Sequence, residues 1–297
     1  MLLDSASLYF RAFHGVPESV TAPDGTPVNA VRGFLDSIAF LVRERKPDRL
    51  VACLDLDWRP KFRTDAVPSY KAHRVSPKGG ETVPDTLVPQ VPIILDVLGA
   101  LGIAAVGSEG FEADDVIGTI AHRARGPVEV VSGDRDLFQV VRDKPPVHVL
   151  YVGKGVRKYE AMGEAEVEAK YGVPGPRYAD FAVLRGDPSD GLPGVKGVGE
   201  KSAAALISKF GSLDAMVAAL DAGTEAGFPA GARTKLAESR DYLEAAPAVA
   251  RVRTDCPLPA YDDALPKEPA HPRKLVDLGE RWGLDNTFNR LLAALAG

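Results

Sequence analysis

The sequence predicts an α/β fold in which a central, mostly parallel sheet is flanked by helices and followed by a helical C-terminal part. In the first half, short apolar runs rich in branched residues alternate with stretches of helix-like apolar spacing, which is typical of repeated β–α units. After about residue 164 the strand signal disappears and alanine-rich helical stretches follow. Acidic residues come directly after several apolar runs, at the strand ends where ligands gather in such sheets.

Buried strands are expected in four runs of the first half, at residues 50–55, 102–107, 128–134 and 147–152. Their branched apolar residues suit strands that are covered on both faces. Helices are expected between them, at residues 28–43, 91–101 and 113–124. Right-handed crossovers would place these helices on both faces of the sheet. Asp4, Asp55 and Asp134 each follow an apolar run, so we expect them at one edge of the sheet.

The β–α pattern stops between residues 59 and 92, where prolines, cations and a glycine pair accumulate. This stretch is too long for an ordinary connection, so it is either functional or disordered. Its cations are Arg59, Lys61, Arg63, Lys71, His73, Arg74 and Lys78. Within residues 62–74, aromatic residues such as Tyr70 are interleaved with cations, which suits a phosphate strand with a base that can stack. A solvated helix face is the alternative.

The second half is expected to be helical, with helices at residues 202–210, 213–220 and 232–245 and one more near the C-terminus. The tail after Cys256 is otherwise rich in proline, and no internal repeat is evident. We therefore expect two domains, an α/β domain at residues 1–165 and a helical domain at residues 166–297.

The composition is that of an ordinary globular protein, with 45% hydrophobic residues and a formal net charge of −5. This net charge at first counts against a nucleic-acid partner, but many acids cluster where bound metal ions would cancel part of their charge. No apolar run approaches the roughly 20 residues of a membrane helix, and the start lacks the basic region of a signal peptide. Cys53 and Cys256 lie far apart, so we expect a cytoplasmic protein without a disulfide framework.

Acidic residues form five groups along the chain: Asp4; Asp55 with Asp57; Glu112, Asp114 and Asp115; Asp134 with Asp136; and Asp187 with Asp190. Any one group could serve a helix N-terminus as a cap or through the helix dipole. Five groups that converge in the predicted fold instead indicate a divalent-metal site. Hydrolysis of a phosphodiester by two metal ions needs carboxylates in such numbers, because Mg²⁺ keeps several waters that further acids can bind. Without metal these acids would repel one another.

The segment at residues 185–203 joins an acidic pair to a glycine-rich turn. Asp187 and Asp190, at i and i+3, can share one side of a turn and hold a hard cation. The glycines that follow, Gly194, Gly197 and Gly199, free backbone N–H groups to point at a phosphate. A plain connection between two helices is the alternative, but it does not explain glycines spaced so closely.

Other site chemistries fit less well. The five histidines are scattered without the spacing of zinc ligands. No segment resembles a nucleophile elbow. The GVGEKS sequence lacks both the leading strand and the residue order of a phosphate-binding P-loop.

Five motifs together resemble the bacterial and phage 5′-nuclease family, which includes flap endonucleases and the 5′–3′ exonuclease domain of DNA polymerase I. They are LLDSASLYFRAFHG, FRTDAVPSYKAHR, FEADDVIGTIA, VVSGDRDLFQVV and RGDPSDGLPGVKGVGEKSA, in the family's order over roughly the first 210 residues. The resemblance implies an α/β nuclease domain, a helical arch at about residues 60–92, and a duplex-binding helix–three-turn–helix motif at about residues 185–210. It further implies a free-standing, structure-specific metal-dependent 5′ nuclease that removes flaps and RNA primers during DNA replication and repair.

The same resemblance assigns site residues by motif position. The ligands of two or more Mg²⁺ or Mn²⁺ ions, or their supports through water, would be Asp4, Asp55, Glu112, Asp114, Asp115, Asp134, Asp136, Asp187 and Asp190. Lys71 and Arg74 would act on the scissile phosphate. The residues that contact DNA would be Arg63, Tyr70, Lys71, Arg74, Gly194, Lys196, Gly197, Gly199 and Lys201. Members of the family often hold a K⁺ ion at the glycine turn.

The implied partners are DNA with 5′ flaps, junctions, nicks or overhangs, and RNA–DNA primers, bound by a nucleoid-associated monomer. Two departures from the family pattern stand out. The loop before Phe62 differs by one residue, so Asp57 competes with Asp55, which we prefer because it directly follows the apolar run. Gly191 stands where the family usually has Asn, which is expected to loosen that turn. A junction-binding protein that does not cut and an RNA-specific ribonuclease are the alternative functions.

Overall fold

Seven strands form one sheet in the described part of the chain, which comprises residues 1–77, 79–229 and 231–297 of the computed structural model. The strand order is β3-β2-β1-β4-β6-β5, with β7 also paired to β6. The strands are β1 (Leu2–Asp4), β2 (Val51–Cys53), β3 (Ala104–Val106), β4 (Val128–Ser132), β5 (Arg142–Asp143), β6 (Pro146–Tyr151) and β7 (Glu160–Met162). The pairs among β3, β2, β1, β4 and β6 are parallel, and β5 and β7 are antiparallel to β6. The mostly parallel sheet is therefore confirmed.

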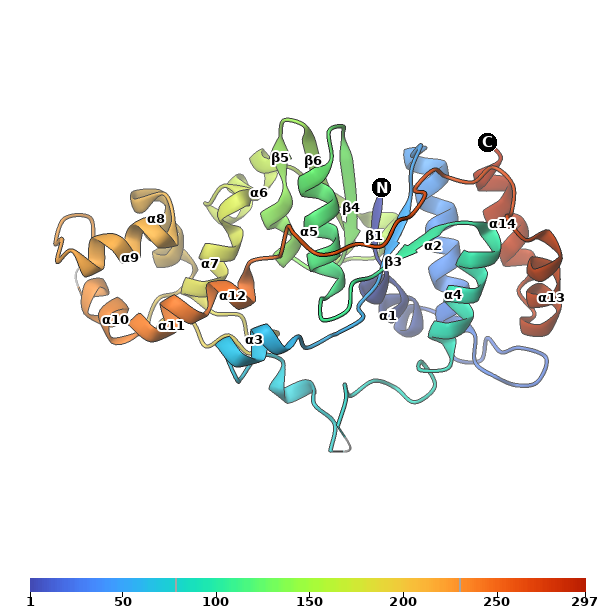
Figure 1. Ribbon diagram of the computed structural model, residues 1–297, viewed down its shortest axis with the longest axis horizontal. Coiled ribbons are helices and arrows are strands. Elements are labelled where there is room, and N and C mark those ends of the chain that lie inside the picture. Colours follow the sequence, from blue (N-terminus) through green and yellow to red (C-terminus); the bar gives the residue numbers. More distant parts are fainter. Residues whose placement is uncertain (78, 230) are drawn as a thin grey trace.

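The strands alternate between two hydrophobic cores, because successive side chains of a strand point to opposite faces. Leu2 and Val130 belong to one core, and their neighbours Leu3 and Val131 belong to the other. The first core is covered by α5 (Ala113–Arg123) and α7 (Tyr178–Arg185), and the second by α1 (Ser5–Gly15), α2 (Asn29–Arg45) and α4 (Gln90–Leu101). Figure 1 shows the sheet between these two groups of helices.

The second half is helical after β7, as predicted. Its first helices are α6 (Glu164–Tyr171), α8 (Glu200–Phe210), α9 (Leu213–Asp221), α10 (Ala232–Glu238), α11 (Arg240–Ala245) and α12 (Pro247–Ala250). The predicted helix at residues 232–245 is divided at Ser239 into α10 and α11. No single helix among the described residues is long and apolar enough to cross a membrane. The pair α8 and α9 reaches the required length and composition only together, across a bend of 79°.

The chain returns from the helical part to the sheet through an extended segment. Just before β2, the Leu50 N–H donates to the Asp263 carbonyl at 2.9 Å. Near the end of α4, the His271 N–H donates to the Ala100 carbonyl at 2.9 Å. The last helices, α13 (Pro272–Trp282) and α14 (Asp285–Leu295), then pack on α4 and α2 (Figure 1). The predicted last helix corresponds to α14, whereas the division into domains at residue 165 stays a prediction.

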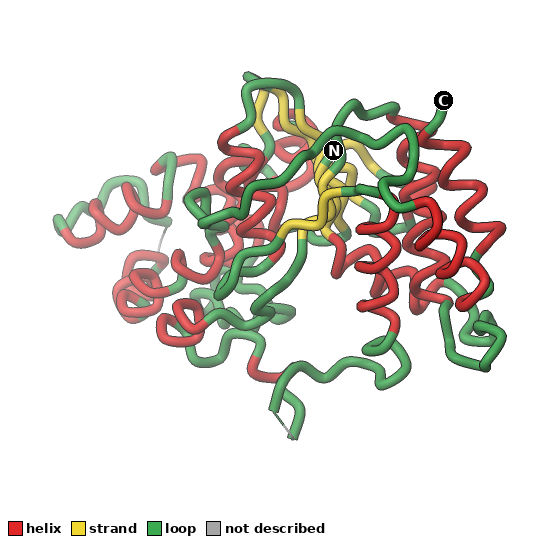
Figure 2. Tube along the Cα trace, turned by 45° about the vertical axis from the view of Figure 1, so that its right-hand side comes forward, coloured by secondary structure: helices red, strands yellow, loops and turns green. Residues whose placement is uncertain are grey.

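The arch region contains less helix than the resemblance implies. It begins with α3 (Lys61–Ala66) and a single 3₁₀ turn at Ala72–Arg74, and the described residues from 75 to 89 form a loop without a helix. Pro77, Pro84 and the glycine pair explain this, because proline lacks a helical N–H donor and glycine disfavours a helix interior. Lys78, one of the predicted basic residues, lies outside the described residues. Figure 2 shows this long loop below the strands.

Candidate active site

The carboxyl ends of β1, β2 and β4 meet at one edge of the sheet, as predicted, because these strands are parallel and in register. Asp4 pairs with Cys53 of β2, so Asp55 and Asp134 follow the strand ends on either side of it. The Asp4 carboxylate is buried and accepts hydrogen bonds from the Ser7 N–H at 3.1 Å and the Ser132 hydroxyl at 2.5 Å. Asp4 therefore caps α1 and also faces the strand ends.

A cavity of about 460 Å³ opens at this edge of the sheet. Its lining includes five of the predicted metal ligands and both predicted catalytic cations: Asp4, Asp55, Glu112, Asp114, Asp134, Lys71 and Arg74. Motifs separated by more than a hundred residues in the sequence thus meet in one recess. This convergence was the main expectation from the acidic groups.

The lining of this cavity decides between Asp55 and Asp57 as the carboxylate of the site. Asp55 lines it and accepts a hydrogen bond from the Ala113 N–H at 2.6 Å. Asp57 is not among its lining residues and instead accepts a hydrogen bond from the Arg59 N–H at 3.1 Å. The geometry favours Asp55 as the carboxylate that acts in the cavity.

Several acids of the cavity resist ionisation. Burial, followed by the charge of Asp55, raises the pKa of Asp4 to about 7. Burial, followed by the charge of Asp134, raises the pKa of Asp114 well above its usual range. Asp55 is open to solvent inside the recess, yet the protein that surrounds it removes enough water to raise its pKa as well. Carboxylates that are costly to ionise in isolation are suited to a cation, which would offset both burial and repulsion.

A second acidic group adjoins the cavity through Asp134. Burial and then the charge of Asp134 raise the pKa of Asp136 well above its usual range, with Asp190 and Asp187 as further contributors. Burial raises the pKa of Asp190 to about 6, while Lys71 opposes this and Asp134 adds to it. Asp136, Asp187 and Asp190 are not among the lining residues of the cavity. Asp134 is therefore the carboxylate that connects the two acidic groups.

Divalent cations fit the chemistry of these donors, since hard cations prefer carboxylate oxygens. Within the described residues, no three His, Cys, Asp or Glu side chains form a ready-made ligand group. The acids instead surround the recess at a wider spacing, which suits ions that keep several waters and bind few carboxylates directly.

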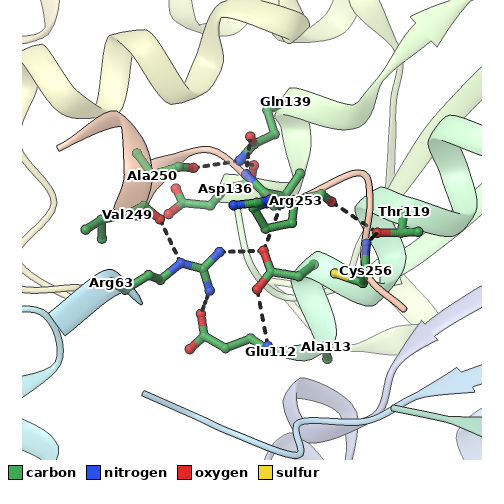
Figure 3. Close-up of polar contacts among 12 residues, drawn as sticks. Arg63, Glu112, Ala113, Thr119, Asp136, Gln139, Val249, Ala250, Arg253 and Cys256 are labelled. Atoms are coloured by element: carbon green, nitrogen blue, oxygen red, sulfur yellow. Dashed lines mark hydrogen bonds and ion pairs between the residues drawn. The ribbon is translucent and has the colours of Figure 1, made fainter. Parts of the chain in front are cut away.

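Glu112 is held by three donors from the predicted basic stretch. Arg63 and Lys71 each form an ion pair with it, and the Tyr70 hydroxyl donates to it at 2.7 Å. Arg63 also donates to the Val249 carbonyl at 3.1 Å, and Figure 3 shows its guanidinium between Glu112 and Val249. Arg63 is 2% exposed and Tyr70 is 1% exposed. The predicted DNA contacts of these two residues are therefore wrong for this conformation, because both side chains are buried and engaged with Glu112.

Asp115 also faces away from the cavity. It is fully buried, accepts a hydrogen bond from Arg63 at 2.6 Å and from the Arg253 N–H at 2.8 Å, and caps α5 through the Glu112 N–H at 3.2 Å. As a direct metal ligand Asp115 is thus excluded in this conformation. Its contacts instead fix Glu112 and Arg63 and attach the segment after α12 to the start of α5.

Lys71 and Arg74 lie at the cavity on the first turns of the arch region. The Lys71 ammonium pairs with Glu112 and donates to the Trp58 carbonyl at 3.4 Å. Burial lowers the pKa of Lys71, but the adjacent Glu112 and Asp190 outweigh burial and raise it overall, so the ammonium stays protonated. Arg74 lies 3.6 Å from the Asp190 carboxylate and donates to the Ser189 carbonyl at 2.7 Å. Both side chains therefore place positive charge beside the cavity, where an anion could bind.

The glycine-rich turn presents its backbone to solvent, as predicted. Val195 and Val198 are buried beneath it, whereas Gly197, Gly199, Lys196 and Lys201 are exposed. In the described part of the chain, the N–H groups of Gly197 and Gly199 have no hydrogen-bond acceptor. Two free donors and two flanking lysines form a surface that suits a phosphate backbone.

Sequence reasoning missed several residues that line the cavity, among them Tyr9, Trp58 and Glu81. Tyr9 lies on α1, five residues after its N-cap Asp4, a spacing that does not by itself place both on one face of the helix. Trp58 and Glu81 come from irregular segments, where no periodicity indicates the direction of a side chain. Burial raises the pKa of Glu81, and Lys71 and Arg74 partly oppose this.

In EDTA, the free energy of unfolding is expected to fall between about pH 4 and about pH 7. The folded-state pKa values of Asp4 and Asp190, about 7 and about 6, exceed the usual aspartate pKa of about 3.9. The folded protein therefore binds more protons than the unfolded chain in this window, and the resulting stabilisation is lost as the pH rises through the folded values. Urea unfolding at a series of pH values measures this. A free energy of unfolding that stays level or rises over this pH range would contradict the burial and repulsion of these carboxylates. Added Mg²⁺ should make the fall of the free energy of unfolding smaller.

Comparison with known proteins finds two family models that match this chain. Residues 1–172 match the 5′–3′ exonuclease N-terminal resolvase-like domain, and residues 173–273 match the 5′–3′ exonuclease C-terminal SAM fold. A "5′-3′ exonuclease" of Streptomyces coelicolor is 56% identical over 300 residues, which cover 99% of this chain and 99% of that protein. DNA polymerase I of Mycobacterium bovis is 45% identical over 226 residues, which cover 75% of this chain and 24% of the polymerase.

A solved structure shows the same fold at low sequence identity. The bacteriophage T5 D15 flap endonuclease, in a complex with DNA and metal ions, superposes with a TM-score of 0.62 at 17% identity. The superposition covers 100% of this chain and 99% of that chain. The similarity therefore extends over the sheet, the arch region and the helical part together.

Proposed function

Because the chain belongs to the 5′–3′ exonuclease family, we propose that it is a metal-dependent, structure-specific 5′ nuclease. Its substrates would be DNA with a 5′ flap, nick or overhang, and RNA–DNA primers. Cleavage would release the displaced 5′ strand during replication and repair. A monomer at chromosomal DNA suffices for this, since one chain carries both the acidic cavity and the phosphate-binding turn.

One observation carries this proposal: six carboxylates, five of them predicted metal ligands, and two basic side chains surround a single cavity at the carboxyl edge of the sheet. Cleavage of a phosphodiester requires stabilisation of an attacking water, of a leaving oxygen and of the charge on the phosphate between them. The carboxylates meet the first two needs through metal ions, and the cations meet the third. A protein that only bound junctions would gain nothing from acids that repel one another and the DNA.

The roles of the individual residues follow from their places. Asp4, Asp55, Glu112, Asp114 and Asp134 would hold Mg²⁺ or Mn²⁺ at the cavity, and Asp136, Asp187 and Asp190 would hold or support a further ion beside Asp134. When bound, such ions activate water and stabilise the leaving oxygen. Lys71 stays protonated and stabilises charge on the scissile phosphate, and Arg74 orients that phosphate. Arg63 and Tyr70 keep Glu112 in place.

The duplex would bind at the glycine-rich turn. The free N–H groups of Gly197 and Gly199 and the exposed Lys196 and Lys201 offer contacts to phosphates, which carry no sequence information. A K⁺ ion at this turn would add to the grip on the backbone. Recognition would therefore depend on the shape of the DNA and its free 5′ end.

Cleavage of matched DNA and RNA flaps on the same duplex tests this proposal. We expect both flaps to be cut near the junction with duplex, and an unpaired single strand of the same sequence to be cut much more slowly. Binding should weaken steeply as salt is raised, because phosphate contacts release counterions. Cutting of the RNA flap alone would indicate a ribonuclease, and tight binding without cutting would indicate a junction-binding protein.

A further inference from the structure

The base of the arch and the acidic turn of the helical part are in direct backbone contact. The Lys71 N–H donates to the Asp190 carbonyl at 3.0 Å, and the Ser69 hydroxyl donates to the Gly191 carbonyl at 2.8 Å. Arg74 adds its bond to the Ser189 carbonyl at 2.7 Å. The segment that carries both cations is thus attached to the turn that carries the second acidic group.

Gly191 makes this contact possible. Its φ is +73°, a left-handed conformation that favours glycine. A Cβ at this position would lie 2.2 Å from the Ser69 carbonyl oxygen and 3.4 Å from the Lys71 nitrogen. No other residue could occupy this place unless the two segments moved apart. The expectation that Gly191 loosens the turn is therefore wrong, since the turn is closed by two bonds between Asp187 and Leu192, at 2.9 and 2.8 Å.

Lys71 depends on this contact for its backbone conformation. Its φ is +47°, which is unfavourable for a residue with a Cβ and persists only where the surroundings impose it. The Asp190 carbonyl receives its N–H, and Arg59 holds the preceding Tyr70 carbonyl at 2.6 Å. In this conformation the Lys71 ammonium reaches Glu112 at the cavity, and the charge of Asp190 also acts on it.

We infer that Gly191 is a positioning residue, which sets Lys71 and Arg74 at the correct distance from both acidic groups. The inference rests on the proposed function and adds to it a determinant outside the acidic and basic motif residues. The close approach of two backbones replaces a side-chain contact, so the alignment of cations and carboxylates depends on a residue that has no side chain.

The test compares Gly191→Ala with Gly223→Ala, which imposes the same left-handed strain without a collision. Gly223 has a φ of +71°, and a Cβ there would meet only the Arg233 side chain at 4.0 Å. We expect Gly191→Ala to lower kcat on a flap by up to about 10²-fold with unchanged affinity for duplex, since a displacement of this size misaligns reacting groups. Gly223→Ala should retain the kcat of the unaltered protein. Amide hydrogen exchange in residues 69–74 should accelerate only in Gly191→Ala.

The outcomes separate the inference from the proposed function. Equal kcat and equal exchange in the two variants would overturn the role of Gly191 while leaving the nuclease in place. Accelerated exchange with no flap cleavage by any form of the protein would support the contact and refute the proposed function. If Gly191→Ala does not fold, Ser69→Ala removes one bond of the contact and should lower kcat by about two- to tenfold. An unchanged kcat in Ser69→Ala would then overturn the inference.

Discussion

Replacement of Asp134 by Asn is expected to lower kcat on a 5′ flap by on the order of 10³-fold, while affinity for duplex is retained. The charge of Asp134 raises the pKa of acids on both sides of it, namely Asp4, Asp114, Asp136 and Asp190. Asp134 is among the leading contributors to all four. Asn has the same shape and can keep the bond from the Asp136 N–H, which is 2.8 Å long, so the loss should be of charge alone. Single-turnover cleavage and equilibrium binding measure the two effects separately.

Asp57→Asn is the matched control for this variant. Asp57 belongs to the same acidic motifs but caps the Arg59 N–H outside the cavity. The control should cut at the normal rate, and the Asp134 variant should not. Normal cutting by Asp134→Asn would contradict the site, and a large loss in Asp57→Asn would reverse the choice of Asp55 over Asp57.

Replacement of Lys71 by Ala is expected to lower kcat by about 10²- to 10³-fold, because a fixed charge at the reacting phosphate is lost. The fold should tolerate this change, since Arg63 and Tyr70 still hold Glu112. Alanine and lysine also carry a similar penalty for a positive φ, so the strain of the backbone stays the same. The rate should remain low at saturating flap, which identifies a defect in chemistry rather than in binding.

Lys61→Ala controls for the loss of a cation from the same basic stretch. Lys61 is exposed, and its one ion pair among the described residues is with Asp65 on α3. Its removal should leave kcat within about twofold, because exposed ion pairs of this kind contribute little. Equal losses in the two variants would indicate that net charge, and not the position of Lys71, matters.

The acidic edge of the sheet could be predicted because the alternation of apolar strand runs with helix-spaced apolar residues determines it. Apolar runs indicate parallel strands, and parallel strands bring Asp4, Asp55 and Asp134 to one edge whatever the rest of the chain does. The helices at residues 28–43, 91–101 and 113–124 were placed to within a few residues by the same patterns. The glycine-rich turn could be predicted as an exposed backbone surface because a plain connection between two helices does not need three glycines so close together.

The misplaced residues share a different property: their roles depend on partners that are distant in sequence. Arg63 and Tyr70 have the composition of a nucleic-acid surface, but Glu112 and Val249 bury them. Asp115 matches a ligand motif, yet Arg253 and Arg63 turn it inward. The contact of Gly191 with Ser69 joins backbones that are 122 residues apart, and no local pattern encodes it.

The connection between the helical part and the active site is the main addition from the structure. Arg63 attaches α12 to Glu112, and Asp115 holds the segment after α12 through Arg253 (Figure 3). Gly191 brings the acidic turn against the backbone of Ser69 and Lys71. DNA bound at the glycine-rich turn would thus act on the same rigid unit that holds the cations. Binding and cutting are expected to depend on one another for this reason.

The most direct measurement is incubation of the protein with a labelled 5′ DNA flap in Mg²⁺, in Mn²⁺ and in EDTA. Release of a short product cut near the junction of single strand and duplex, in either metal and not in EDTA, is the predicted result. Cleavage that persists undiminished in EDTA, or tight binding without cleavage in both metals, would contradict a metal-dependent nuclease at this site.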